Sequence, residues 1–154
     1  MLFLGVAEIA AAQSWVYYDI RESKNQFLLQ SNPHKSAWMD IEGDAEFCGK
    51  GDNMLCFKAE KFQFAVPRKP LEVGAEWLHN GNSYRVEEKG RRNLLGKTYS
   101  VFFIDTKFEK FHMRFVYSRE AGLLAITTIH PTPGLLLILD GACGFGAPAS
   151  CHRH

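Results

Sequence analysis

The stretch KFHMRFVYS, residues 110–118, alternates between polar and apolar side chains. A period of two is the pattern of a β-strand whose two faces meet different surroundings. The apolar set is Phe111, Met113, Phe115 and Tyr117, and the polar set is Lys110, His112 and Arg114. We therefore predict a strand with one buried and one solvated face, as in an antiparallel sheet.

The segments on either side continue the strand pattern and are separated by turn residues. Upstream, residues 84–105 read as strand, turn and strand, and they follow an Asn80-Gly81 pair that favours a tight hairpin turn. Downstream, LLAITTI at 123–129 and the apolar run at 135–139 predict two more strands. Nearer the N-terminus, MLCFKAEKFQFAV at 54–66 changes parity near Lys61, which predicts a turn or a bulge.

These patterns together predict a mainly β protein of one domain. Several short strands with turn signals between them indicate an antiparallel sheet that forms a sandwich or a partly open barrel. Helical spacing is weak after the first residues, so we expect at most one or two short helices. The segment 31–44 is the least regular, and a short helix there is an alternative to a strand.

The composition is that of a folded chain with little net charge. The 154 residues are 46% hydrophobic and 13% aromatic, which suits one domain with a sizeable core. The formal charge is +1, from 18 basic and 17 acidic residues, so there is no global electrostatic case for nucleic acid as a partner. No segment approaches the ~20 apolar residues of a membrane-spanning helix.

The N-terminus resembles the end of an export signal. Leu2 to Val6 is apolar, and Ala10-Ala11-Ala12 supplies the small residues that a signal peptidase needs, although Glu8 interrupts the run and no basic residue precedes it. We interpret residues 1–12 as the remnant of a secretory signal peptide and residues 13–154 as a single β-rich domain. The alternative is an N-terminal helix packed on that domain. The first interpretation predicts a periplasmic or extracellular protein.

The four cysteines form two similar pairs, Cys48 with Cys56 and Cys143 with Cys151, and each pair encloses seven residues with glycines among them. Three interpretations compete: local disulfides, a zinc site, or reduced buried thiols. Zinc ligands are usually two to four residues apart, which argues against the metal. An even count and an export signal favour two local disulfides. Connectivity is not decided by sequence, and a bridge between the two pairs stays open.

Charged residues gather in two places that are candidates for binding. RVEEKGRRNLLGK, residues 85–97, predicts a basic hairpin tip that would suit an acidic partner, with Arg85, Arg91 and Arg92 as candidates. DIEGDAE, residues 40–46, places Asp40, Glu42 and Asp44 at alternate positions. This acidic run lacks the ligand spacing of a helix-loop-helix calcium site, so we predict no metal and no cofactor. In both places the alternative is an ordinary exposed edge.

Three functions fit these observations. The nucleophile-elbow, zinc-protease and phosphate-loop motifs are absent from the sequence, so we predict a small exported protein without catalytic activity. It would bind another protein, as an inhibitor or an immunity factor does. The first alternative is a periplasmic carrier that holds a lipid or another apolar ligand on a Phe-rich face, because the chain has 12 phenylalanines. The second is an enzyme whose site is dispersed along the sequence.

Overall fold

The computed structural model describes residues 12–131 and 134–153, and its regular structure is almost entirely β-strand. The described strands form two antiparallel sheets. In spatial order the large sheet contains β4 (Ile41–Asp44), β3 (His34–Trp38), β2 (Gln26–Ser31), β1 (Ser14–Asp19), β13 (Leu136–Leu139), β12 (Gly122–His130), β11 (Phe111–Ser118), β10 (Lys97–Phe108), β9 (Asn82–Leu94) and β8 (Glu76–His79). The small sheet contains β5 (Glu46–Phe47), β6 (Met54–Lys58) and β7 (Gln63–Pro67). Near the C-terminus the described chain forms one short 3₁₀ helix, η1 (Ala149–Arg153). The predicted fold class, mainly β with at most one or two short helices, is confirmed.

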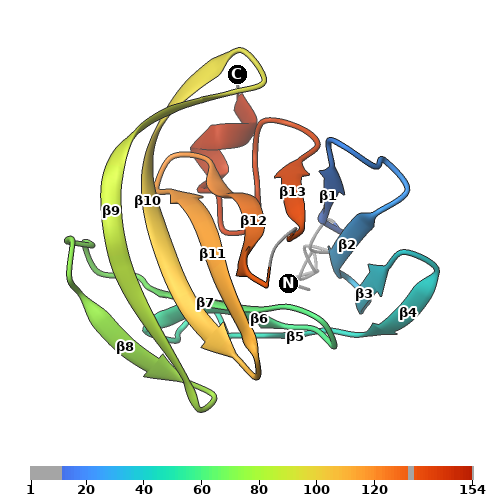
Figure 1. Ribbon diagram of the computed structural model, residues 1–154, viewed down its shortest axis with the longest axis horizontal. Helices are drawn as coiled ribbons and strands as arrows, with labels where there is room; N and C mark the ends of the chain where they lie inside the picture. The colour runs from blue at the N-terminus through green and yellow to red at the C-terminus, as the bar shows by residue number, and fades with distance from the viewer. Residues whose placement is uncertain (1–11, 132–133, 154) are drawn as a thin grey trace, which may run out of the picture.

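The large sheet curls, and the small sheet lies between its two ends, which makes a single sandwich-like domain (Figure 1). At one end the backbone N–H of Ala45, just before β5, donates to the carbonyl of His34 on β3 at 3.2 Å. At the other end the indole N–H of Trp77 on β8 donates to the carbonyl of Ala65 on β7 at 3.0 Å. The small sheet is therefore tied to both margins of the large sheet.

The apolar alternation that predicted β11 is present on its inner face, but the opposite face is not solvated throughout, because Val116 and Ser118 on that face are also buried. Met113, Phe115 and Tyr117 are buried, and the ring of Phe115 lies 4.9 Å from that of Phe64 on the small sheet. The opposite face of β11 carries Arg114, which is about one third exposed. Because successive side chains of a strand point to opposite faces, Met113, Phe115 and Tyr117 share one face, and the rings of Phe115 and Tyr117 place that face against the small sheet.

The turns also follow the sequence signals. Asn80 and Gly81 have φ angles of 49° and 78° and join β8 to β9, and Leu95 and Gly96, at 51° and 86°, join β9 to β10. Two consecutive positive φ values are those of the turn that suits the right-handed twist of a hairpin. The parity change near Lys61 is a turn between β6 and β7, closed by a hydrogen bond from Ala59 N to Phe62 O.

The segment 31–44 contains no helix. It forms the β3–β4 hairpin, in which Ala37 lies opposite Leu28 of β2 and opposite Glu42 of β4. The helix alternative for this segment is wrong, because the neighbouring strand β2 supplies a hydrogen-bonding partner that local sequence does not reveal.

Candidate functional site

Both cysteine pairs are local disulfides. The Cα atoms are 5.1 Å apart in Cys48–Cys56 and 5.9 Å apart in Cys143–Cys151, within the ordinary range for a disulfide. No cysteine of the described chain is free. The predicted pairing, in which each disulfide is local, is therefore confirmed. Because all four described cysteines are in these two bonds, they form neither a bridge between the pairs nor a zinc site of four thiolates.

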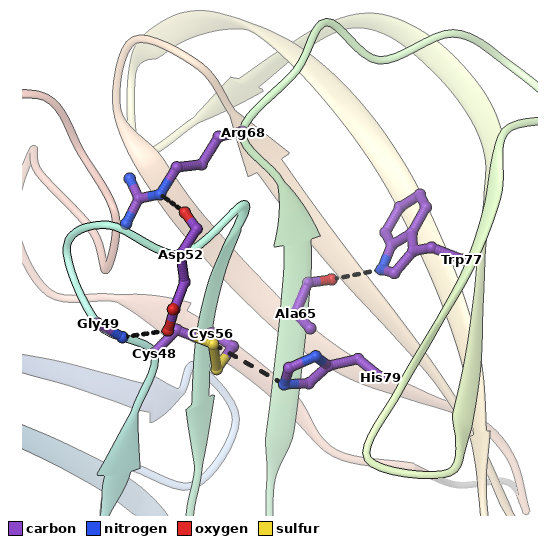
Figure 2. The surroundings of a disulfide bond; sticks show 8 residues. All are labelled: Cys48, Gly49, Asp52, Cys56, Ala65, Arg68, Trp77 and His79. Atoms are coloured by element: carbon purple, nitrogen blue, oxygen red, sulfur yellow. Dashed lines mark hydrogen bonds between the residues drawn. A yellow bond between two sulfur atoms is a disulfide. The ribbon is translucent and has the colours of Figure 1, made fainter.

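The first disulfide faces a histidine from the other sheet. Cys48 follows β5 and Cys56 lies on β6, whereas His79 ends β8 of the large sheet. Figure 2 shows the imidazole ring of His79 directed at the disulfide, and its Nε2 lies 3.8 Å from Cys48 Sγ. Sequence analysis gave His79 no role, because nothing near it in the chain indicates that β8 adjoins the small sheet.

The second disulfide closes a loop that reaches into the core. The loop contains Phe145, which is 4% exposed and lies 5.0 Å from Phe57 and 5.3 Å from Trp15 between ring centres. Its backbone N–H donates to the hydroxyl of Tyr17 at 3.1 Å. This Gly-rich segment is therefore a structural part of the domain.

The aromatic side chains that could have lined a ligand cavity mostly pack against each other. Rings of Phe27, Phe57, Phe64, Phe115 and Phe145 are each at most 4% exposed and form the core between the sheets. Packed rings of this kind leave their interior full. The carrier alternative therefore depends on pockets at the margin of the domain.

One such pocket lies beside the β3–β4 hairpin, and we name it the Trp38 pocket. Its volume is about 230 Å³. Its apolar lining is Trp38, Phe62, Phe108, Phe111, Met113 and Leu135, and its polar lining is Glu60, Lys61, Glu109 and Thr128. Binding pockets for small molecules usually have volumes of ~300–1,000 Å³, so this one suits a single apolar side chain better than a lipid.

The predicted acidic candidates lie together on that hairpin. Asp40, Glu42 and Asp44 are exposed, and the last of them forms an ion pair with Lys35 at 2.7 Å. This hydrogen bond with Lys35 lowers the pKa of Asp44. Met39 and Ile41 are 46% and 56% exposed, so apolar and acidic side chains alternate around the turn and along the edge of the sheet.

The predicted basic candidates are not together. Arg91 and Arg92 lie near the turn between β9 and β10, and Arg92 forms an ion pair with Glu88 at 2.7 Å. Arg85 lies toward the opposite end of β9, where it pairs with Glu76 of β8 at 2.8 Å. The grouping of Arg85 with the hairpin tip is thus wrong, because β9 extends over 13 residues and separates them.

A cluster around the buried carboxyl group of Asp105, which the sequence did not indicate, lies on the polar face of β10 and β11. Asp105 is 7% exposed and accepts hydrogen bonds from Arg114 Nε at 2.6 Å and Arg114 Nη2 at 2.9 Å. His112 Nε2 lies 3.0 Å from the same carboxyl group. The hydrogen bond with Asp105 raises the pKa of Arg114. The alternation of β11 predicts that His112 and Arg114 share one face. It does not predict that Asp105 joins them, because this depends on the pairing of β10 with β11, which places Asp105 opposite Arg114.

Asp19 is the most strongly perturbed carboxyl group among the described residues. Its side chain is 3% exposed, and it accepts hydrogen bonds from the Nε of Arg21 at 3.0 Å and from Nη2 at 2.7 Å. The hydrogen bonds from the Arg21 side chain, helped by those from the backbone, outweigh burial and lower the pKa of Asp19 to about 2. Asp19 does not line the Trp38 pocket, so we assign it to stability.

We expect Asp19→Asn to cost about 2 kcal/mol of unfolding free energy at pH 7, because each pKa unit of stabilisation corresponds to about 1.4 kcal/mol. A lowered pKa in the folded state means that this stabilisation is complete above the ordinary value of 3.8 and is lost as the pH falls through about 2. Urea unfolding from pH 7 to pH 2 measures the difference between the variant and the native chain, with the exposed Asp140→Asn as the control. A loss that is equally large at pH 2 would contradict this account.

Comparisons with known proteins identify no relative: the chain matches no protein-family model, no curated protein and no solved structure. Among the described residues, no helix has the length and apolar character needed to cross a membrane. The two disulfides, the β3–β4 hairpin and the Trp38 pocket beside it are therefore the features of the structure that bear on function.

Proposed function

We propose that this is an exported binding protein that acts without catalysis and recognises another protein, in the manner of an inhibitor or an immunity factor. The observation that carries the proposal is the β3–β4 hairpin, where exposed apolar and acidic side chains alternate at the edge of the large sheet beside the Trp38 pocket. The two disulfides support export, because such bonds persist in oxidising compartments.

The edge strand favours a partner in an extended conformation. β4 pairs with β3 on one side and, among the described strands, has no neighbour on the other. An unpaired edge can accept a strand from another chain through backbone hydrogen bonds, and side-chain pockets then supply specificity. The partner would present a strand to β4.

The charge of the β3–β4 hairpin and the shape of the Trp38 pocket further restrict the kind of partner that would fit. The exposed carboxylates of Asp40 and Glu42 favour a basic segment. Ile41 lines a small hollow that shares Trp38, Glu60 and Lys61 with the Trp38 pocket, so the pocket lies within reach of the edge. We propose that the partner strand carries Lys or Arg toward the hairpin and inserts one apolar side chain into the pocket.

The test compares two charge-reversed proteins with the native chain in affinity capture from the source cell and from its competitors. We expect Asp40→Lys with Glu42→Lys to weaken binding of the captured protein by about tenfold or more, because like charges at an interface cost more than 1.4 kcal/mol. The matched control is Arg91→Glu with Arg92→Glu, which should bind as the native chain does.

Two outcomes would overturn the proposal. If only the arginine variant lost binding, the binding surface would have to lie at the β9–β10 turn and not at the β3–β4 hairpin. Absence of any captured protein, together with a lipid detected by mass spectrometry of the purified chain, would favour the carrier alternative.

A further inference from the structure

The disulfide beside His79 brings three potential metal ligands together. Cys48 Sγ, Cys56 Sγ and His79 Nε2 all lie within 4.8 Å of one another. Cys48 and His79 are partly exposed, and Cys56 is buried. Figure 2 shows Cys56 on a strand of the small sheet with Cys48 beside it, and His79 on the facing strand of the large sheet.

The positions of these residues are held by contacts that do not involve the S–S bond. Cys48 N donates to Cys56 O at 3.1 Å, which joins the two cysteine backbones directly. The carboxylate of Asp52 accepts a hydrogen bond from Gly49 N at 2.6 Å and orders the intervening loop. On the facing strand, the Trp77 indole bonded to Ala65 O fixes β8 two residues before His79. The three side chains should therefore remain neighbours when the disulfide is opened.

We propose that reduction of Cys48–Cys56 by a dithiol creates a Zn²⁺ site whose protein ligands are Cys48 Sγ, Cys56 Sγ and His79 Nε2. The dithiol supplies two electrons and two protons and becomes a disulfide, while the protein disulfide becomes two thiols. Zinc binding then releases both thiol protons to solvent, since thiolates are the ligands. Water completes the tetrahedron, because the site is partly open to solvent.

The geometry suits tetrahedral zinc. Bond lengths of ~2.3 Å to sulfur and ~2.05 Å to nitrogen require an S···N separation of ~3.6 Å and an S···S separation of ~3.8 Å. Cys48 Sγ and His79 Nε2 are already 3.8 Å apart. The two sulfur atoms must move apart from bonding distance to ~3.8 Å, and rotation of the two cysteine side chains can provide this once the bond is reduced. Two thiolates and one imidazole are also ligands that zinc prefers.

The test uses the full chain after reduction with a water-soluble phosphine, which takes the oxygen of one water molecule and leaves two thiols, followed by anaerobic removal of the phosphine. Co²⁺ is the spectroscopic probe, and Zn²⁺ displaces it. We expect one ion per chain, with tetrahedral visible bands and a thiolate charge-transfer band, and no such spectrum from the oxidised protein. The same spectrum should form in the Cys143→Ser, Cys151→Ser background, which removes the other two thiols.

Substitutions of the proposed ligands test whether these residues bind the metal ion. Because loss of a second-shell partner already costs about 10–100-fold in metal affinity, His79→Ala should weaken Zn²⁺ binding by more than about tenfold, and Cys48→Ser should abolish the thiolate spectrum of the site. His130→Ala, at an exposed histidine on β12, is the matched control and should bind as the native chain does. Unchanged binding in His79→Ala, or equal binding by the oxidised protein, would overturn the proposal.

Circular dichroism of the same samples covers the case in which reduction unfolds the chain. Zn²⁺ would then have to restore the strand signal in the native chain and fail to do so in His79→Ala. Absence of any metal-dependent change in both spectra would equally overturn the proposal.

Discussion

Replacing Phe145 with alanine is expected to lower the free energy of unfolding by about 3–5 kcal/mol, the range for removing a buried phenylalanine ring. The ring is 4% exposed and contacts Trp15, Phe57 and Phe64, which belong to both sheets. Alanine would leave a cavity where these three meet, and their backbones are too constrained to fill it. Urea unfolding followed by tryptophan fluorescence measures the loss, since Trp15 lies against the altered position.

Two comparisons make this result interpretable. Leu78→Ala removes an aliphatic side chain that is 75% exposed and should change stability by less than about 0.5 kcal/mol. Phe145→Leu should give an intermediate loss, because it retains much of the buried volume. A loss below about 1 kcal/mol in Phe145→Ala would mean that the segment of residues 143–151 does not pack into the core.

The strands and their turns could be predicted because their signals are local. Residues 110–118 have a period of two that no helix would satisfy, and β11 keeps Met113, Phe115 and Tyr117 on its buried face, although Val116 and Ser118 on the other face are buried as well. The Asn80-Gly81 pair supplies the two positive φ values that the turn requires. In each case the physical cause lies within a few residues of its effect.

The arrangement of the strands could not be predicted, because it depends on contacts between distant parts of the chain. β1 pairs with β13, so that Tyr17 lies opposite Leu139. The place of the small sheet between the ends of the large one likewise depends on side chains such as Trp77, which bonds to β7. Apolar periodicity says that a strand has a buried face but does not say which strand covers it.

The same limit applies to the candidate sites. The acidic candidates of the β3–β4 hairpin lie close together, as predicted, because one turn and one short strand contain them, whereas Arg85 was grouped with a turn that lies ten residues farther along the chain. His79 was missed because its neighbour, Cys48, is 31 residues away in the chain and follows a strand of the other sheet. Phe145 was missed because a Gly-rich segment without periodicity resembles a loose tail. Its role becomes visible only when Tyr17 and Leu123 are seen to bond to its backbone.

Removing the second disulfide with the double substitution Cys143→Ser and Cys151→Ser is expected to cost about 2–3 kcal/mol of unfolding free energy while the sheets stay intact. The cost arises mainly in the unfolded state, because without the disulfide the unfolded chain has a higher conformational entropy. Cys48→Ser with Cys56→Ser is the matched comparison, because both disulfides join residues eight positions apart. The chain-entropy account therefore predicts nearly equal losses in parallel urea unfolding experiments.

Equal losses would show that the Cys143–Cys151 segment is held in the folded state by its own contacts. Gly144 N donates to Ala121 O at 2.7 Å and Leu123 N donates to Phe145 O at 2.9 Å, and neither bond needs the disulfide. We therefore expect only the η1 helix to loosen, and near-ultraviolet circular dichroism of the core aromatics to remain. If the loss for the second pair approached that of Phe145→Ala and the aromatic signal disappeared, the disulfide itself would be what holds Phe145 in the core.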